Sequence, residues 1–218
     1  MDEYITIALP KGKLFDKSVR LLAKVGYSAD NVTEDSRKLV ISNEETKVRF
    51  IIAKTVDVPT YVEYGAADIG VVGKDTIMEE NRKNYEVLDL GFGKCRMCVC
   101  GPNSAKELLN SHEVIRVATK YPVIAKDYFH NEKHRTVDII KLNGSIELAP
   151  IVGLSDVIVD IVETGSTLRE NGLEVLEEIH PISARMIVNR VSMNMESKRI
   201  NNLIKDIKEV LNDKNGAI

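Results

Sequence analysis

The stretch GLSDVIVDIVETGSTLREN, residues 153–171, contains the alternation that decides the fold. A glycine and a small residue lead into a continuous apolar run, a short polar loop follows, and a helical pattern ends in Glu-Asn. The stretch GAADIGVVGKDTIMEEN, residues 65–81, repeats this order with a shorter loop. Continuous apolar strands that alternate with helices are typical of a parallel sheet covered on both faces. The sequence therefore predicts an α/β protein, and the repeat suggests two similar lobes around a ligand cleft.

Other segments fit the same scheme. Further strands are predicted at YITIALP (4–10), VRFIIA (48–53), CRMCVCG (95–101), VIRVATKY (114–121) and VDIIKLN (137–143). After Pro181 the chain reads ISARMIVNRVSM, which predicts one more strand, and an amphipathic helix follows. We expect this last strand to return to the first lobe. The predicted domains are lobe I, residues 1–92 with 181–218, and lobe II, residues 93–180, joined by a two-strand hinge.

Composition narrows the function classes. The chain has 218 residues, of which 44% are hydrophobic and 29% charged, as in folded globular proteins. Its net charge of −3 and its scattered lysines and arginines leave no basic surface for nucleic acid. The N-terminus carries acids where a signal peptide carries bases, and no apolar run approaches the ~18 residues of a membrane span. We expect a cytoplasmic protein that binds neither nucleic acid nor membrane.

Three cysteines occur in KCRMCVCGP, residues 94–102. Cys95 and Cys98 have the C-x-x-C spacing of a metal site, but a closed zinc site needs four ligands and the nearest histidine follows on another element. Cys98 and Cys100 alternate with apolar residues as strand residues do. The pattern favours buried, reduced thiols over a metal site.

The loop that follows VIVDIV has the composition of an anion site. Ligands of open α/β sheets bind beyond the carboxyl ends of the strands, and Thr164, Gly165, Ser166 and Thr167 lie there. Gly165 lets the backbone turn and approach a ligand, Ser166 and Thr167 supply donors, and a helix predicted from about Leu168 points its dipole at the same place. An ordinary helix cap explains these residues equally well. The carboxylates just upstream would repel phosphate unless they bind sugar hydroxyls or a metal.

This loop resembles the 5-phosphoribosyl-1-pyrophosphate loop of phosphoribosyltransferases, and longer motifs narrow the resemblance. The chain is similar to the ATP phosphoribosyltransferases of histidine biosynthesis over nearly its whole length. The motifs that carry this similarity are ALPKGKL (8–14), DSRKL (35–39), DVPTYVEYGAADIGVVGKD (57–75), RVATKYP (116–122) and NGSIELAPIVGLSDVIVDIVETGSTLRENGL (143–173).

The resemblance implies a fold and partners. The family fold consists of two periplasmic-binding-protein-like (type II) lobes around a cleft. The chain stops after its amphipathic helix and so resembles the short form, which lacks a C-terminal regulatory domain. That form works with a regulatory subunit similar to histidyl-tRNA synthetase. We therefore expect a hetero-octamer that contains a homodimer of catalytic chains.

The resemblance also implies the reaction. Adenine N1 of ATP attacks ribose C1 of 5-phosphoribosyl 1-pyrophosphate and expels pyrophosphate, with Mg²⁺ as the expected cofactor. Thr164 to Thr167 would bind the 5-phosphate. Asp160 and Glu147 would hold the ribose hydroxyls and contact the metal through them, and Glu163 is a further candidate. A glutamate near a helix start is also commonly explained by the helix dipole, which is the alternative for Glu147.

Cations after the first strand would bind the polyphosphates. Lys11 and Lys13 flank Gly12, and we assign Lys11, Arg37 and Lys54 to charge stabilisation at the transferring centre. Lys13 and Lys54 stand where many relatives have arginine, so the charge is kept and the planar fork is lost.

Four more residues of lobe I are candidates for nucleotide binding: Arg49, Asp68, Gly73 and Lys74. Arg49 could equally be an exposed strand residue, and Asp68 could instead cap or bridge within its lobe. The rival function is a two-lobed binding protein or sensor that uses the cleft without chemistry. No histidine is needed as a general base, because adenine N1 is already a lone-pair nucleophile.

Overall fold

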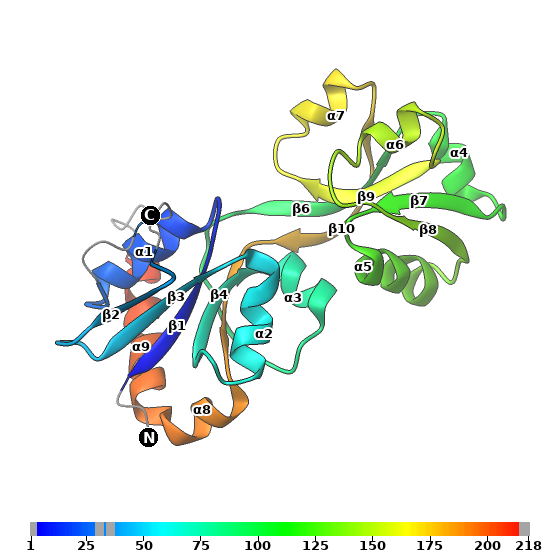
Figure 1. Cartoon of the computed structure of the whole chain (residues 1–218). Helices are drawn as coiled ribbons and strands as arrows, with labels where there is room; N and C mark the ends of the chain where they lie inside the picture. The colour runs from blue at the N-terminus through cyan, green and yellow to red at the C-terminus, as the bar shows by residue number, and fades with distance from the viewer. Residues whose placement is uncertain (1–3, 29–32, 34–37, 214–218) are drawn as a thin grey trace. The chain divides into compact units, whose positions relative to one another are not determined.

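A computed structural model describes residues 4–28, 33 and 38–213 (Figure 1). The chain divides into two compact units, Met1–Gly93 with Ser183–Ile218 (unit 1) and Lys94–Ile182 (unit 2). Each unit is built around one sheet, and each sheet contains a core of three neighbouring parallel strands.

Unit 1 contains a six-stranded sheet in the order β2-β3-β1-β4-β11-β5. Its central strands β3, β1 and β4 are parallel, whereas β2 and β11 run antiparallel to their neighbours. The strands are β1 (Ile5–Pro10), β2 (Val40–Asn43), β3 (Val48–Ala53), β4 (Ile69–Gly73), β5 (Tyr85–Asp89) and β11 (Ala184–Val188). All residues of β1 and β4 are buried, because helices cover both faces of the sheet.

The helices of unit 1 divide between the two faces (Figure 1). Helices α1 (Phe15–Lys24) and α9 (Ser197–Asn212) pack over the face that carries Ile5, Ile7 and Leu9 of β1. Helices α2 (Val58–Glu63) and α3 (Lys74–Glu80) pack over the opposite face, with Ala8 and Ala53. A short 3₁₀ turn η1 (Thr55–Asp57) leads into α2, and α8 (Arg190–Met195) precedes α9.

Unit 2 contains a five-stranded sheet in the order β10-β6-β9-β7-β8. Strands β9, β7 and β8 are parallel, and β6 runs antiparallel between β9 and β10. The strands are β6 (Cys95–Gly101), β7 (Ile115–Thr119), β8 (Val137–Lys141), β9 (Val157–Val162) and β10 (Glu174–Ile182). Helices α6 (Leu148–Ile151) and α7 (Ser166–Glu170) cover one face, and α5 (Pro122–Lys126) lies on the other (Figure 1). Helix α4 (Ala105–Asn110) connects β6 to β7.

Several local expectations change in the structure. Strands β2, β5 and β10 were not predicted, and α5 continues into a π-helical segment η2 (Asp127–Glu132). The strand expected after Pro181 is also divided: Ile182 ends β10, β11 begins at Ala184, and the last residues of that stretch form α8. In the part of the chain that the structure describes, no helix has the length and apolar character needed to cross a membrane.

Candidate functional site

The parallel strands of unit 2 end together at one edge of their sheet. Strand β9 is followed by the loop at residues 163–165, β7 by Lys120, and β8 by the segment that leads to Glu147. Because carboxyl ends of parallel strands meet at one edge, groups that are far apart in the sequence converge there. This edge combines hydroxyl and backbone donors with carboxylates and lysine side chains.

Gly165 determines the shape of the loop after β9. Its φ is +72°, in the left-handed region that a residue with a Cβ adopts at a cost. A Cβ at this position would lie 3.3 Å from Nη1 of Arg169, whose guanidinium closes over the turn. The same Nη1 donates to the carbonyl oxygen of Thr164 at 3.0 Å. Arg169 therefore braces the loop from inside the following helix, a role that the sequence did not indicate.

The hydroxyls of the loop are exposed. Oγ1 of Thr164 and Oγ of Ser166 lie 3.1 Å apart, and Thr167 is exposed beside them. Helix α7 begins at Ser166, not at Leu168, because Gly165 in its left-handed conformation already serves as the N-cap. The helix has only five residues, so its dipole is short and the local N–H and O–H groups carry most of the binding capacity.

Asp160 is the most perturbed carboxylate at this edge. It points to the face of β9 that also carries Ile158 and Val162, and it lies opposite Cys98 of β6. Burial raises the pKa of Asp160 to about 6, although the backbone N–H of Ile161 donates to its Oδ1 at 2.8 Å and lowers it. A buried carboxylate with few partners is destabilising unless it has a task in ligand binding.

Glu147 and Lys120 act on the same carboxylate. The charge of Glu147 raises the pKa of Asp160 further, and the charge of Lys120 lowers it. The structure thus places Glu147, Asp160 and the loop at the same edge. These are the residues that the family resemblance assigned to one sugar phosphate. Lys120 is part of the motif RVATKYP (116–122), but it was not among the predicted site residues. Its position directly after β7 was the signal that could have identified it.

A second group of candidate residues lies at the carboxyl edge of the sheet in unit 1. Lys11 follows β1 and donates its backbone N–H to the carbonyl of Ala53 at 2.8 Å, while the hydroxyl of Thr55 donates to the carbonyl of Lys11 at 3.1 Å. These bonds fix the turn after β1 against the turn after β3, which contains Lys54. Gly12 has a φ of +98°, and Lys11, Lys13 and Lys54 are exposed. Three lysines therefore share one edge.

Gly73 and Lys74 reach the same edge from β4. Lys74 begins α3, and its Nζ forms an ion pair with Glu86 at 2.6 Å. Arg185 of β11 also pairs with Glu86, at 3.4 Å, and with Asp89 at 3.1 Å. Lys74 is thus part of a charge network that ties α3 to β5, and a nucleotide would have to compete with Glu86 for it.

The structure agrees with the interpretation of Cys98 and Cys100 as buried, reduced thiols. None of the three forms a disulfide: Cys98 and Cys100 are buried within the core under α6 and α7, and Cys95 is partly buried. Burial raises the pKa of Cys98 and of Cys100, which keeps both in the neutral thiol form.

Comparison with known proteins assigns a family to this arrangement. The sequence profile of the HisG family, described as ATP phosphoribosyltransferase, matches residues 54–209. The chain belongs to the ATP phosphoribosyltransferase family. An ATP phosphoribosyltransferase of Lachnoclostridium phytofermentans is 69% identical over 212 residues, which cover 97% of this chain and 99% of that relative.

Solved structures extend the comparison. A chain of the ATP phosphoribosyl transferase (HisG:HisZ) complex from Thermotoga maritima matches with a TM-score of 0.78 and 34% identity, over 95% of this chain and 98% of that chain. The periplasmic aliphatic sulphonate binding protein SsuA from Escherichia coli matches with a TM-score of 0.59 at 12% identity, over 96% of this chain and 68% of its own. The second likeness shows the fold alone. The prediction of an α/β, periplasmic-binding-protein-like fold is confirmed.

Two of the residues assigned to the nucleotide do not lie with the others in this ATP phosphoribosyltransferase chain. Arg49 is the second residue of β3, at the amino end of the strand whose carboxyl end precedes Lys54, and its guanidinium lies 4.8 Å from the ring centroid of Tyr4. Because five residues of extended strand separate it from Lys54, about 16 Å of sheet lies between them.

Asp68 likewise lies at the amino edge, just before β4. Its Oδ2 accepts from the backbone N–H of Thr6 at 2.8 Å, and its Oδ1 accepts from the hydroxyl of Ser192 at 2.6 Å. Asp156 has the same place in unit 2, where its Oδ2 accepts from the backbone N–H of Arg116 at 2.8 Å. The repeated sequence order thus produces the same carboxylate bridge between two parallel strands twice. The bridging alternative explains the contacts of Asp68, and the cleft-facing expectation does not.

Arg37, the remaining predicted catalytic cation, lies outside the residues that the structure describes.

Proposed function

We propose that this chain transfers the 5-phosphoribosyl group of 5-phosphoribosyl 1-pyrophosphate to N1 of ATP. The products are N1-(5-phosphoribosyl)-ATP and pyrophosphate, and the reaction is the first step of histidine biosynthesis. The observation that carries the proposal is the edge of unit 2, where a phosphate-binding loop, the carboxylates Asp160 and Glu147, and Lys120 converge in a member of the ATP phosphoribosyltransferase family.

The edge of unit 2 suits a sugar phosphate better than a bare phosphate. The backbone N–H groups and hydroxyls of residues 164–167 are donors for the three acceptor oxygens of a 5-phosphate. Asp160 and Glu147 are acceptors for the O–H donors of ribose, and Glu163, the first residue of the loop, is a further candidate. With a pKa of about 6, Asp160 is mainly ionised at neutral pH and accepts from two hydroxyls.

The same carboxylates suit the bond changes. The C1–O bond to pyrophosphate breaks with its electron pair leaving on oxygen, and the lone pair of adenine N1 forms the new C1–N bond. Positive charge builds on the ribose ring while negative charge builds on pyrophosphate. Carboxylates held near the ribose stabilise the first, and lysine side chains stabilise the second. No proton is removed from N1, so no general base is required.

We assign the polyphosphate charges to the cations at the carboxyl edge of unit 1. Lys11, Lys13 and Lys54 are exposed there, and no atom lies within 4 Å of the place that a Cβ of Gly12 would occupy. Lys11 and Lys54, together with Arg37, would stabilise the charge that develops on the leaving group. Gly73 and Lys74 remain candidates for the nucleotide.

Mg²⁺ is the expected cofactor, and the carboxylates present would bind it together with the phosphates of the substrate. Among the described residues no group of three or more His, Cys, Asp or Glu side chains could hold a metal ion by itself. Mg²⁺ is usually bound by one or two carboxylates plus substrate phosphates and water. Asp160 and Glu147 supply such a pair, and the bound ion would neutralise charge on the pyrophosphate.

We also propose a partner and a compartment. The Thermotoga maritima relative was solved in a HisG:HisZ complex, and this chain matches nearly all of that HisG-like chain. A HisZ-like regulatory subunit, similar to histidyl-tRNA synthetase, would therefore assemble with a homodimer of this chain into a hetero-octamer. Both substrates are cytoplasmic metabolites, so we place the activity in the cytoplasm.

The deciding experiment mixes the purified chain with ATP, 5-phosphoribosyl 1-pyrophosphate and Mg²⁺, with and without a HisZ-like subunit. Product is identified by mass and pyrophosphate by a coupled assay, and each substrate is omitted in turn. We expect product only when both substrates are present. Thr167→Ala should lower the affinity for 5-phosphoribosyl 1-pyrophosphate in calorimetry while the far-UV circular dichroism stays unchanged. Binding of both substrates without product under every condition would instead indicate a sensor.

A further inference from the structure

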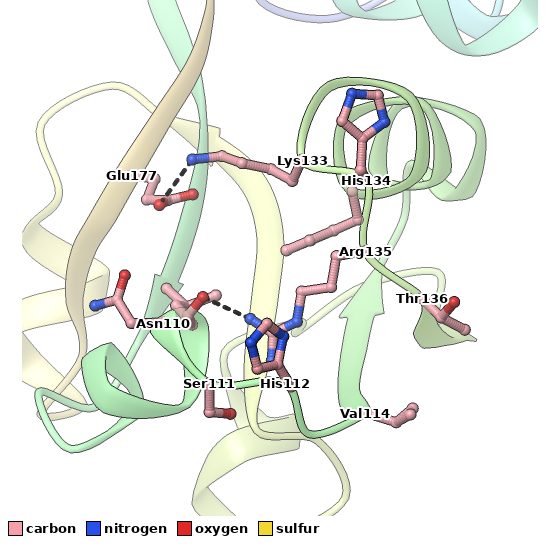
Figure 2. A pocket seen from close by; sticks show the side chains of 11 residues that line it. Asn110, Ser111, His112, Val114, Lys133, His134, Arg135, Thr136 and Glu177 are labelled. Atoms are coloured by element: carbon pink, nitrogen blue, oxygen red, sulfur yellow. Dashed lines mark hydrogen bonds and ion pairs between the residues drawn. The ribbon is translucent and has the colours of Figure 1, made fainter.

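Unit 2 contains a cavity that the proposed reaction does not use. It has a volume of about 560 Å³ and is lined by residues from three parts of the unit (Figure 2). These are Leu109 to His112 with Val114, Phe129 with Lys133 to Thr136, and Glu177 of β10. The first two segments directly precede β7 and β8, so the cavity lies at the amino ends of strands whose carboxyl ends carry the phosphoribosyl site. Five residues of strand separate the two edges by about 16 Å. A small ligand in this cavity cannot reach the loop at residues 163–167.

Arg135 holds the first wall in place. Its Nη1 donates to the carbonyl of Leu109 at 2.6 Å, and its Nη2 donates to the carbonyls of Leu108 and Glu113, both at 2.7 Å. These bonds fix the end of α4 and the start of the next segment against the chain before β8. The Nε of Arg135 is buried and has no hydrogen-bond partner among the described residues. Arg135 therefore acts as a support of the wall and not as a donor that faces the cavity.

The second wall is fixed through Glu177. Lys133 extends across the cavity and forms an ion pair with Oε1 of Glu177 at 3.0 Å, as Figure 2 shows. The hydroxyl of Tyr128 donates to the other carboxylate oxygen. The chain reaches Lys133 through the π-helical segment η2, and His134 follows with a φ of +51°. Single π-helical turns and left-handed residues other than glycine are uncommon, and both are frequent near functional sites.

The lining favours an organic anion. Lys133 and Arg135 face one carboxylate, so the lining is net positive even when His112 and His134 are neutral. This local excess occurs in a chain of net charge −3. Leu109 and the exposed Val114 add an apolar surface to the same cavity. A volume of about 560 Å³ is far larger than an inorganic ion needs and lies within the range of small-molecule pockets.

We propose that this cavity is a second ligand site, for a small organic anion that carries one carboxylate or phosphate group on an apolar body. The anionic group lies between Lys133 and His112, and the apolar part lies against Leu109 and Val114. The proposal is independent of the transferase reaction, because none of these residues belongs to the phosphoribosyl site.

The test uses the histidines as local reporters in the full chain. The protein has four, of which His112 and His134 line the cavity, while His130 and His180 do not and serve as internal references. Phenyl phosphate and benzoate are titrated separately while the ring signals are followed by NMR, with benzyl alcohol as the neutral counterpart. We expect saturable shifts of the His112 and His134 signals with a Kd of about 1 mM or below for at least one anion. Benzyl alcohol should leave these signals in place.

Three variants separate this site from the phosphate-binding loop. Lys133→Gln and His112→Gln should each weaken the response of the His134 signal about tenfold, with unchanged circular dichroism. Thr167→Ala should leave it unchanged, because the loop lies at the other end of the strands. The proposal is overturned if neither anion gives saturable shifts, if both cavity variants bind with the affinity of the parent chain, or if Thr167→Ala abolishes the response.

Discussion

Replacement of Asp160 by asparagine should make the protein more stable at neutral pH and less able to bind its sugar phosphate. The pKa of Asp160 is raised from the ordinary 3.8 to about 6, chiefly by burial. Because the folded state holds the proton more tightly than the unfolded state, the ionised carboxylate destabilises the fold above pH 6 and has no effect below its unfolded pKa. A shift of about two units corresponds to about 3 kcal/mol at pH 8 and to roughly half of that at pH 5.

Asparagine removes this cost with little change of shape. It keeps an oxygen for the backbone N–H of Ile161, which donates to Oδ1 at 2.8 Å. Urea unfolding followed by circular dichroism should therefore give a larger free energy of unfolding for Asp160→Asn than for the parent, by up to about 3 kcal/mol at pH 8. The difference should shrink as the pH falls and vanish near pH 4. Asp138→Asn, at an exposed position of β8, is the matched control and should change stability by no more than about 0.5 kcal/mol.

Two results would refute this reasoning. A difference that stays constant from pH 4 to pH 8 would mean that the change acts through packing and not through ionisation. A variant less stable than the parent at pH 8 would mean that the ionised carboxylate has a strong partner that offsets its burial. In calorimetry the same variant should bind 5-phosphoribosyl 1-pyrophosphate more weakly, which would give the unfavourable burial of Asp160 a functional reason.

Other positions give further expectations. Gly165→Ala should destabilise the fold by about 1 kcal/mol, because its φ is +72°, and should weaken binding of 5-phosphoribosyl 1-pyrophosphate in calorimetry. Lys54→Ala should lower kcat about tenfold or more in the transferase assay. Arg49→Gln, at the other end of the same strand, should leave kcat and KM within about twofold. Equal losses in the two variants would mean that both ends of β3 contribute to the reaction. Asp68→Ala and Asp156→Ala should each cost about 1–3 kcal/mol in urea unfolding, because each leaves a strand N–H without its acceptor. A rise in KM for ATP with unchanged stability in Asp68→Ala would return that residue to the nucleotide site.

The fold class could be predicted because the buried parallel strands are continuous apolar runs. Strands β1, β3, β4, β7 and β9 all have this character. The strands that were missed are β2, β5 and β10, which carry polar residues in at least half of their positions or lie at a sheet edge. Their place is decided by pairing with a neighbour and not by their own composition.

The candidate site could be predicted where one short segment contains the whole signal. The loop at residues 163–167 is such a segment. Lys120 is not, because a single lysine after a strand has no local pattern, and only the order of the strands brings it to Asp160. Arg49 and Asp68 lie apart from the other candidates for the nucleotide. Both come early in or just before a strand, which places them at the amino edge, and the direction of a parallel strand was information that the sequence already contained.

The first and last residues of unit 2 lie next to each other. Cys95 at the start of β6 pairs with Ile182 at the end of β10, and within unit 1 the backbone N–H of Ala184 donates to the carbonyl of Phe92 at 2.9 Å. The point where the chain leaves unit 1 is thus next to the point where it returns, which is the geometry of a domain inserted into a loop. Residues 94–182 can be excised as one uninterrupted polypeptide, and a short glycine linker from Gly93 to Ser183 closes unit 1 without them. We expect the two units to become separate reagents, on which the proposed assignment of one substrate to each unit can be tested by titration.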